Sequence, residues 1–453
     1  MILGAAFLGW LFAGVHMSIT QMTAQPAAID LLGRTNRIDV DQLSSFNKRF
    51  KSKSADERLS VEQLQRLDGW KSEIARWFTW IQCAFLFGAA TGGFVFGWLG
   101  DRIGRSKAMA ASILTYSCMS AVAALTQSPL QFWAVWFVAC TGVGGMWPNG
   151  VAIVAEAWSS LSRPALAGVI GTAANVGIFA MSTIGTQLAI APDSWRWVML
   201  LGATPLLIGL LAWAFVPESP QWLAMRSAAQ DQMLSAGGPS RTSQTAELFR
   251  PPLLGLTLVA ILLGTVPMIG GWGTANWMNP WADETGNPLL KAQLGQARAL
   301  AGIAGSLMGG WIANRLGRRL TYCLVSLGSL LVAETIFWRV LPLDDAFLPL
   351  VAVLGFFNGL YFGWLPLCIP EFFPTRVRAT GAGIGFNFGR IITAVTLNAT
   401  TAPAKMHLRS VYLTCPPLVE PAMGRICEEP APTGDVTPSL SWWVDPRCWA
   451  RLF

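Results

Sequence analysis

The sequence predicts an all-α membrane protein, because it is poor in charge, its apolar residues fall in long blocks, and part of it repeats. Of 453 residues, 53% are hydrophobic and 13% are charged, whereas about a quarter of a soluble domain is charged. The mean hydropathy is +0.45. The apolar blocks run to roughly 18 to 25 residues, the length that a helix needs to cross a hydrocarbon core of about 30 Å. Most of the chain is therefore expected to lie in lipid.

The apolar blocks predict eleven membrane-spanning helices. A membrane β-barrel is not expected, because alternating segments of about ten residues are missing from the sequence. The first six blocks fall at 2–25, 77–99, 108–126, 131–154, 167–190 and 197–216. The other five fall at 253–275, 295–313, 320–338, 346–369 and 380–402.

Two polar segments divide the chain. The stretch 227–252, rich in Ser, Gln, Gly and Ala, is expected to be a cytoplasmic linker between an N-terminal six-helix bundle at 1–226 and a C-terminal bundle at 253–402. A polar outside loop at 26–76 separates the first two spans. The spacing of Val61, Leu64 and Leu67 predicts an amphipathic helix within this loop.

Basic residues in the short loops predict a cytoplasmic N-terminus in a multi-pass protein of the cell (inner) membrane. In this orientation the short outside loops carry only Arg196, Lys291, Arg298 and Arg339. The inside loops carry Arg102, Arg105, Lys107, Arg163, Arg226, Arg241, Arg250, Arg315, Arg318, Arg319, Arg376 and Arg378. The 26–76 loop is an exception to the rule that basic residues stay on the cytoplasmic side, because it carries about ten of them. It also carries nearly as many acids, and it is long enough to translocate despite its charge.

Several classes of function are not expected. The net charge is +7, but the basic residues lie in short loops rather than on one polar face, so no nucleic-acid partner is expected. Eight cysteines occur without a C-x-x-C pair, and His16 and His407 are the only histidines. No metal site, cofactor or disulfide framework is therefore predicted. An enzyme is not expected and no catalytic residue is assigned, because the spans contain no Ser/His/Asp cluster or paired carboxylates.

The loops after the second and the eighth spans share one pattern. Trp98, Arg102, Gly104 and Arg105 recur 213 positions later as Trp311, Arg315, Gly317 and Arg318. Glu156 and Arg163 after the fourth span likewise match Glu371 and Arg378 after the tenth, 215 positions later. The chain is therefore expected to consist of two parallel repeats, as in transporters that alternate access around a site between the halves.

These loops resemble those of the major facilitator superfamily. So do Pro217-Glu218-Ser219-Pro220-Gln221-Trp222-Leu223 after the sixth span and the segment from Pro370 to Arg378 after the tenth. The resemblance covers the chain to about residue 400. It implies twelve helices in two six-helix bundles, and loop charges that form a conformational latch holding the outward-facing state. The latch residues are Asp101, Arg102, Arg105, Glu156, Arg163, Arg315, Arg318, Glu371 and Arg378. Asn314 stands where the pattern has an acid, so the latch is expected to be weaker in the second half.

The resemblance also bears on the substrate. The Pro-Glu-Ser-Pro motif is similar to that of sugar porters, but Gln221 stands where an arginine is usual, and the Gln-rich motif expected in the seventh span is absent. The long first loop and the segment from Gly381 to Arg390 resemble the organic-ion and aromatic-acid symporters more closely. An organic or aromatic acid is the expected substrate, and a sugar is the alternative.

Arg390 is the leading candidate for substrate binding. It lies near the middle of the eleventh span, where an arginine costs roughly 2.5 to 3.5 kcal/mol and needs a polar partner. A guanidinium offers a planar donor fork to a carboxylate, whereas an internal ion pair is the alternative. The same cavity is expected to be lined by Asn387, Asn358, Asn276, Trp272, Asn175 and Gln82, with Asn279 and Gln21 as further polar candidates.

The coupling ion is an open question in the sequence. The resemblance implies one or two acids in the first span, but this chain reads Gly9-Trp10-Leu11-Phe12-Ala13-Gly14-Val15-His16. Because histidine titrates near neutrality, His16 is the candidate for proton coupling. The alternatives are a hydrogen-bonded packing role for this histidine and facilitated diffusion without a proton.

The segment 403–453 differs in composition from the rest of the chain. It is rich in Pro and Cys, and no twelfth span can be drawn in it. An altered reading frame or a truncated gene is the expected cause.

The whole pattern predicts a monomeric carrier of a small organic metabolite in the lipid bilayer, working by alternating access. From another class, a non-transporting membrane sensor that signals through the 26–76 loop is the alternative.

Overall fold

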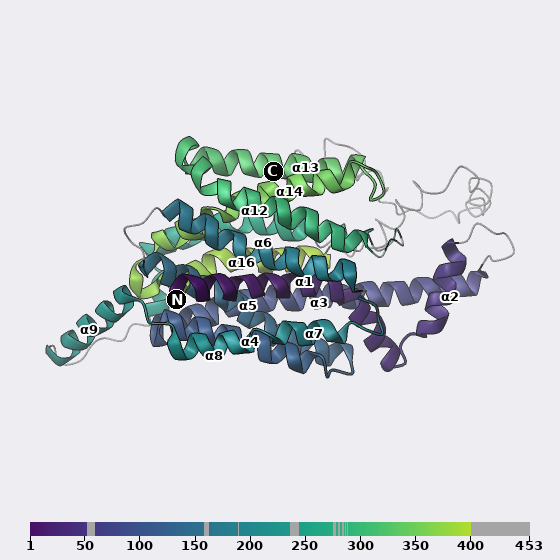
Figure 1. The fold of residues 1–453 in the computed structure, drawn as a ribbon, viewed down its shortest axis with the longest axis horizontal. Coiled ribbons are helices and arrows are strands. Elements are labelled where there is room, and N and C mark those ends of the chain that lie inside the picture. Colours follow the sequence, from purple (N-terminus) through teal and green to yellow (C-terminus); the bar gives the residue numbers. More distant parts are fainter. Residues whose placement is uncertain are drawn as a thin grey trace, which may run out of the picture. The chain divides into compact units, whose positions relative to one another are not determined.

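A computed structural model describes residues 1–51, 59–157, 163–188, 190–235, 244–274, 278–279, 281–282, 285, 287 and 289–399, which are helical and contain no strand. The first half holds α1 (Ile2–Arg34), α2 (Val40–Lys51), α3 (Val61–Ile103), α4 (Arg105–Ala123), α5 (Pro129–Ala157), α6 (Arg163–Gln187), α7 (Arg196–Ala203) and α8 (Leu206–Phe215). The chain continues through α9 (Pro220–Ser235), η2 (Gln244–Phe249), α10 (Leu253–Met268) and η3 (Ile269–Gly273). It then forms α12 (Leu290–Leu316), α13 (Arg318–Arg339), α14 (Phe347–Phe362), α15 (Leu365–Cys368), η4 (Ile369–Phe372), η5 (Thr375–Val377) and α16 (Arg378–Ala399). Figure 1 shows the long helices lying alongside one another.

Each of the eleven expected spans coincides with helix in the described residues, and α7 and α8 share the sixth span. By length and composition alone, seven of the described helical segments are apolar enough to cross a membrane. The other four spans correspond to α4, α12, α14 and α16. Two of these carry interior arginines, the buried Arg390 in α16 and the partly buried Arg298 in α12, and such interior polar faces lower the hydropathy of a helix that other helices surround. Residues 400–453, in which the sequence predicts no twelfth span, lie outside the described residues.

Helix covers most of the polar 26–76 segment. The first helix, α1, runs on to Arg34, and α3 begins at Val61, where Ser60 and Gln63 form a capping box. The amphipathic helix expected there exists as the start of α3, but Val61 is exposed and Leu67 is buried. Figure 1 shows this part of α3 and the neighbouring α2 extending past the other helices. They share a small apolar core of Leu32, Ile38, Leu43, Phe46, Leu67 and Ile74.

Lys291 and Arg298 are not in an outside loop, contrary to the expectation from the sequence. Both lie in α12, which begins at Leu290. Ala299, the residue after Arg298, is already buried. The sequence between Leu289 and Arg298 is polar, and the eighth span was expected to begin only at residue 295. In the structure its polar side chains bond to the first half of the chain instead: Gln296 donates to Thr183 at 3.1 Å, and Arg298 donates to Gln21 at 2.7 Å.

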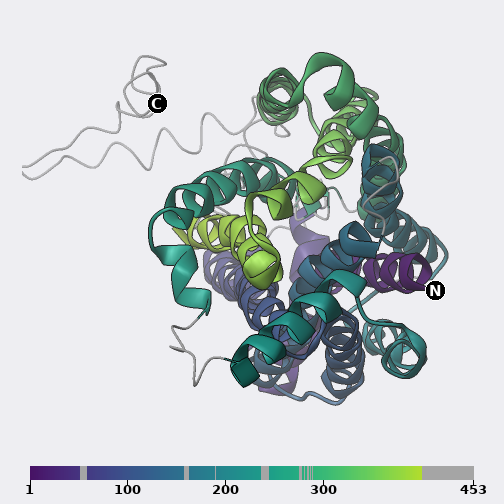
Figure 2. The same cartoon turned by 90° about the vertical axis from the view of Figure 1, so that its left-hand side faces the viewer.

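The two halves meet along two seams, with α3 against α16 and α6 against α12. Figure 2 views the helices end-on, with α16 in yellow-green within the bundle. Small residues allow the close approach: a Cβ on Gly383 would lie 2.1 Å from the carbonyl oxygen of Gly93, and one on Gly168 would lie 3.2 Å from that of Ser306. The substrate pathway of a two-bundle carrier lies between such seams.

Candidate functional site

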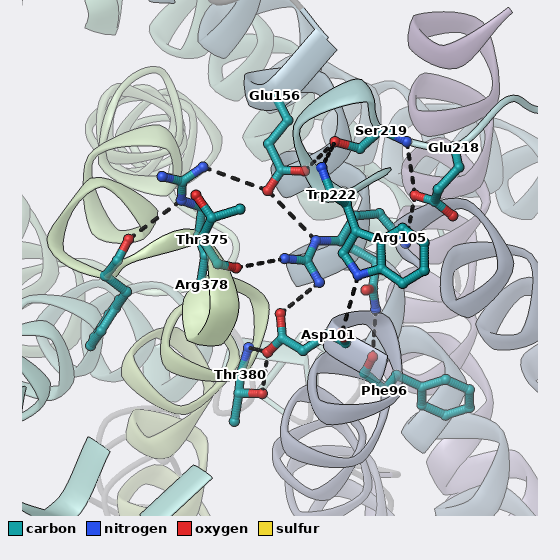
Figure 3. Close-up of polar contacts among 12 residues, drawn as sticks. Phe96, Asp101, Arg105, Glu156, Glu218, Ser219, Trp222, Thr375, Arg378 and Thr380 are labelled. Carbon is teal, nitrogen blue, oxygen red and sulfur yellow. Dashed lines mark hydrogen bonds and ion pairs between the residues drawn. The ribbon is translucent and has the colours of Figure 1, made fainter. Parts of the chain in front are cut away.

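A buried ion network joins the halves where α3 ends and α4 begins, an end of the bundle that we call the latch end (Figure 3). The Arg105 side chain is 0% exposed and lies between two carboxylates, with Nη1 2.6 Å from Asp101 and Nε 3.6 Å from Glu156. These contacts are ion pairs without hydrogen-bond alignment. Because all three side chains are buried, each charge depends on the others for its stability.

The same network crosses from the first half to the second. Arg105 Nη2 donates to the carbonyl oxygen of Thr375 at 2.9 Å. Asp101 accepts from the backbone N–H of Thr380 at 3.0 Å, at the start of α16, and from the Thr380 hydroxyl. Arg378 Nη1 approaches Glu156 at 3.5 Å. The latch end is therefore closed by polar contacts along the α3–α16 seam.

The Pro-Glu-Ser-Pro segment after the sixth span is part of this network, a role that the sequence does not reveal. Glu218 accepts from the backbone N–H groups of Arg105 and Ser106, at 2.8 Å and 3.1 Å, at the start of α4, where a carboxylate suits the helix dipole. Ser219 donates its hydroxyl hydrogen to Glu156. The Trp222 indole donates to the Asp101 carbonyl at 3.1 Å. The segment thus bonds to the Glu156 carboxylate and to the backbone of Asp101, Arg105 and Ser106 (Figure 3).

The second copy of the loop makes far fewer contacts. Arg318 pairs with Glu371 at 3.0 Å, both in the second half, and the Arg318 side chain is 56% exposed. The sequence predicts Arg102 and Arg315 in the latch, but the structure places them on the rings of Trp98 and Trp311, at 4.1 Å and 4.3 Å, with no carboxylate partner in the described part of the chain. Helical i, i+4 spacing explains this placement, because it puts each arginine beside its tryptophan. The Arg163 side chain lies outside the described residues.

Gly104 and Gly317 give a matched test of the two loop copies. Their φ values are +111° and +83°, a region that costs other residues about 1 to 3 kcal/mol. A Cβ on Gly104 would lie 2.1 Å from Glu218, whereas a Cβ on Gly317 meets nothing within 4 Å. Gly104→Ala is therefore expected to lower the thermal unfolding temperature of the purified protein clearly more than Gly317→Ala. Equal shifts would show that Glu218 does not lock the first loop.

Arg390 lies inside the bundle on α16, against α3. It is 12 residues after Arg378, about 18 Å along the helix at 1.5 Å per residue. The side chain is 1% exposed, and its guanidinium lies 5.6 Å from the centre of the Phe85 ring. Its Nε and Nη1 have no hydrogen-bond partner within the described residues. A buried charge with open donors is costly in a membrane bundle unless a partner satisfies it.

Three of the amides expected at the cavity carry unused hydrogen-bonding atoms. Gln82 is 1% exposed, stands one helical turn from Phe85 on α3, and has no partner for either amide atom within the described ranges. Asn387 donates to the Gly383 carbonyl at 3.0 Å, and its Oδ1 is open, as is that of Asn358. Asn175 instead bonds to Ser306 at 3.4 Å in the α6–α12 seam. Asn276 and the Trp272 side chain lie outside the described residues.

Aromatic rings from both halves lie between Arg390 and the latch end. Trp147 of α5 contacts Trp10 at 4.2 Å, Phe386 at 5.6 Å and Phe362 at 6.5 Å between ring centres. Phe386 is one helical turn from Arg390 on α16. We call these four rings the aromatic floor. The sequence does not single them out, because aromatic residues occur throughout the spans.

His16 lies within the first half and not on the α3–α16 seam. Its Nδ1 is 2.9 Å from the Phe12 carbonyl oxygen and its Nε2 is 3.1 Å from the Ser120 hydroxyl. The ring packs against Tyr116 at 4.6 Å between centres and is fully buried. Both nitrogens are therefore occupied by neutral partners, an arrangement typical of a packing residue.

Comparisons with known proteins agree with this architecture. A family model described as the Major Facilitator Superfamily matches residues 69–396. The xylose transporter XylE from E. coli, in a partially occluded inward open conformation, superposes with a TM-score of 0.54 at 17% identity, over 87% of this chain and 90% of that one. At this identity the likeness shows the fold alone.

Relatives in sequence are transport proteins. A cis,cis-muconate transport protein of Acinetobacter baylyi is 29% identical over 315 residues, which cover 68% of this chain and 74% of the relative. A gallate transporter of Pseudomonas putida is 24% identical, over 68% of this chain and 73% of the relative. Since the family model spans most of the sequence, the chain belongs to the Major Facilitator Superfamily and is a multi-pass membrane transporter of small metabolites, not an enzyme.

Proposed function

We propose that this chain carries an organic acid, with aromatic acids as the favoured class, across the cell (inner) membrane by alternating access. The observation that carries the proposal is Arg390, a buried guanidinium with two open donor atoms that lies over Phe85, one helical turn from the unpartnered amide of Gln82 on α3. A carboxylate would satisfy these donors with charge-assisted hydrogen bonds. It would also offset the cost of the buried charge, about 2.5 to 3.5 kcal/mol on insertion scales.

The aromatic floor supports the ring part of the substrate. Phe386 and Trp147 lie toward the latch end from Arg390, so a ring attached to the bound carboxylate has apolar faces to pack on. The relatives named for muconate and gallate transport are named for acids. The sugar alternative has no comparable support, because the likeness to XylE shows only the fold.

The latch supplies the conformational step of the proposed cycle. With the N-terminus in the cytoplasm, as the loop charges predict, the latch end is the cytoplasmic end. Arg105 and Arg378 then hold the halves together on that side and close the pathway to the cytoplasm. Rocking of the halves must break these contacts before the substrate leaves inward.

The proposal is tested by uptake of a labelled panel of aromatic carboxylates, organic cations and sugars in a transport-deficient host, at two pH values. Saturable uptake of a carboxylate, unaffected by excess sugar, is the expected result. Saturable uptake of sugar without carboxylate would favour the sugar alternative. Lack of any uptake, with the protein confirmed in the membrane, would contradict the proposal and favour a sensor.

Proton coupling through His16 is a separate prediction. If His16 carries the coupling proton, His16→Ala removes the pH dependence of net uptake and leaves exchange of labelled for unlabelled substrate intact, since exchange moves no net proton. Ser120→Ala is the control, because it removes one hydrogen-bond partner of His16 and keeps the imidazole. An unchanged pH profile in His16→Ala, with a lower unfolding temperature, would assign this histidine to packing.

A further inference from the structure

A second arginine, Arg298, lies inside the bundle on the opposite seam. It is carried by α12 and reaches across to α1 of the first half, where Nη2 donates to Gln21 Oε1 at 2.7 Å. Gln21 is 5% exposed, and its own Nε2 has no partner in the described part of the chain. Arg298 also borders a small cavity together with Met278, Asn279, Leu294, Gly295 and Val351. The Asn279 amide nitrogen beside this cavity is buried and likewise lacks a partner there.

The interior charge is unbalanced. Neither Arg298 nor Arg390 has a carboxylate partner within the described residues, whereas Arg105 pairs with Asp101 and Arg196 pairs with Asp30. A neutral amide compensates a buried guanidinium only partly, because it supplies a dipole and no countercharge. Two guanidinium groups without a countercharge inside one membrane bundle therefore favour the binding of two negative charges between them.

The positions of the two arginines suit one extended ligand. Arg298 lies 18 residues before Leu316 at the latch end, about 27 Å along α12, and Arg390 lies about 18 Å from that end along α16. The two Cα positions therefore differ in depth by about 9 Å. Both arginines belong to the second half and reach residues of the first, Gln21 on α1 and Phe85 on α3. A short chain with an anionic group at each end would bridge both arginines.

We propose that the transported acid is a dicarboxylate, with one carboxylate on Arg390 and the other on Arg298. This inference rests on the proposed function, and it adds that the substrate carries two charges. Gln21 Nε2 and the Asn279 amide supply further donors beside Arg298. When the substrate binds, the Arg298–Gln21 contact opens to accept the second carboxylate. A monocarboxylate leaves Arg298 on Gln21 and binds more weakly.

The test compares a diacid with its own monoester in proteoliposomes that contain the full chain. The probes are labelled cis,cis-muconate and its monomethyl ester, which share a carbon frame and differ by one charge. For the unchanged protein, the KM for muconate is expected to be at least about tenfold lower than that for the ester, because one charge-assisted bidentate contact is lost. In Arg298→Gln the two KM values are expected to converge, through a selective loss of affinity for muconate.

A second variant guards against misfolding of Arg298→Gln. Gln21→Glu keeps Arg298 and gives it an internal carboxylate at the position it already contacts, so it is expected to abolish the preference for muconate as well. A preference for muconate that persists in both variants would overturn the proposal, as would equal KM values in the unchanged protein. In either of these outcomes the dicarboxylate proposal fails, but uptake of the monoester would still agree with the proposed function, because the monoester is an organic acid. Failure to transport either probe would overturn this inference, whereas the proposed function is decided separately by the panel of aromatic carboxylates.

Discussion

Replacing Arg105 with glutamine is expected to lower the transport rate at least about a hundredfold. The guanidinium is fully buried between Asp101 and Glu156, so its removal leaves two buried carboxylates with reduced countercharge. Breaking one partner of a buried ion network costs about 3 to 5 kcal/mol, and each 1.4 kcal/mol is a tenfold change in an equilibrium constant. The closed form of the latch end becomes rare, and the carrier stays open on that side.

Two measurements check this expectation. Transport is measured in proteoliposomes, and closure is measured by the reaction of a thiol reagent with Ala379→Cys in a background without the native cysteines. Ala379 is fully buried beside Gly97 on the α3–α16 seam. The introduced cysteine is expected to react faster when Arg105 is replaced, because the seam is open for more of the time.

The internal repeat supplies the control. Arg318 occupies the place of Arg105 in the second loop copy, but its side chain is 56% exposed and its pair with Glu371 stays within one half. Exposed pairs contribute about 0 to 1 kcal/mol, so Arg318→Gln is expected to change transport less than about fivefold. Equal losses in the two variants would contradict the assignment of the latch to the first copy.

Arg390→Gln is expected to reduce saturable uptake of the acid substrate at least about a hundredfold, since a charge-assisted bidentate contact in a low-dielectric site is lost. The protein is expected to fold, because removing a buried charge without a carboxylate partner relieves a desolvation cost. Arg390→Lys keeps the charge but loses the planar fork, and an intermediate rate is expected. Arg339→Gln is the matched control, because Arg339 is exposed at the end of α13.

Hydropathy and repeats predict the framework of this fold. Long apolar blocks placed a helix at each of the eleven expected spans, because backbone groups in lipid must bond within their own segment. The offset of 213 positions between Trp98 and Trp311 pointed to paired loops. Asn314 in place of an acid led us to expect a weaker second loop, and the structure shows fewer contacts there.

Contacts between distant segments are what the sequence cannot show. Arg298 was counted with an outside loop because it falls at the very start of the eighth expected span, whereas in the structure Gln296 and Arg298 bond across a seam. Glu218 and Ser219 stood out only as a family motif, since their partners lie more than 60 residues away. The aromatic floor likewise forms from four helices, and the order of residues in the chain gives no sign of it.

The central claim, that Arg390 binds the carboxylate of the substrate, is tested most directly by equilibrium binding to the purified full chain. Calorimetry would compare an acid taken up in the panel with its primary amide, which has the same shape and no charge. The unchanged protein is expected to bind the acid at least about a hundredfold more tightly than the amide. Arg390→Gln is expected to bind both weakly and alike. If Arg390→Gln kept the full preference for the acid, the carboxylate site would lie elsewhere and the account would be wrong.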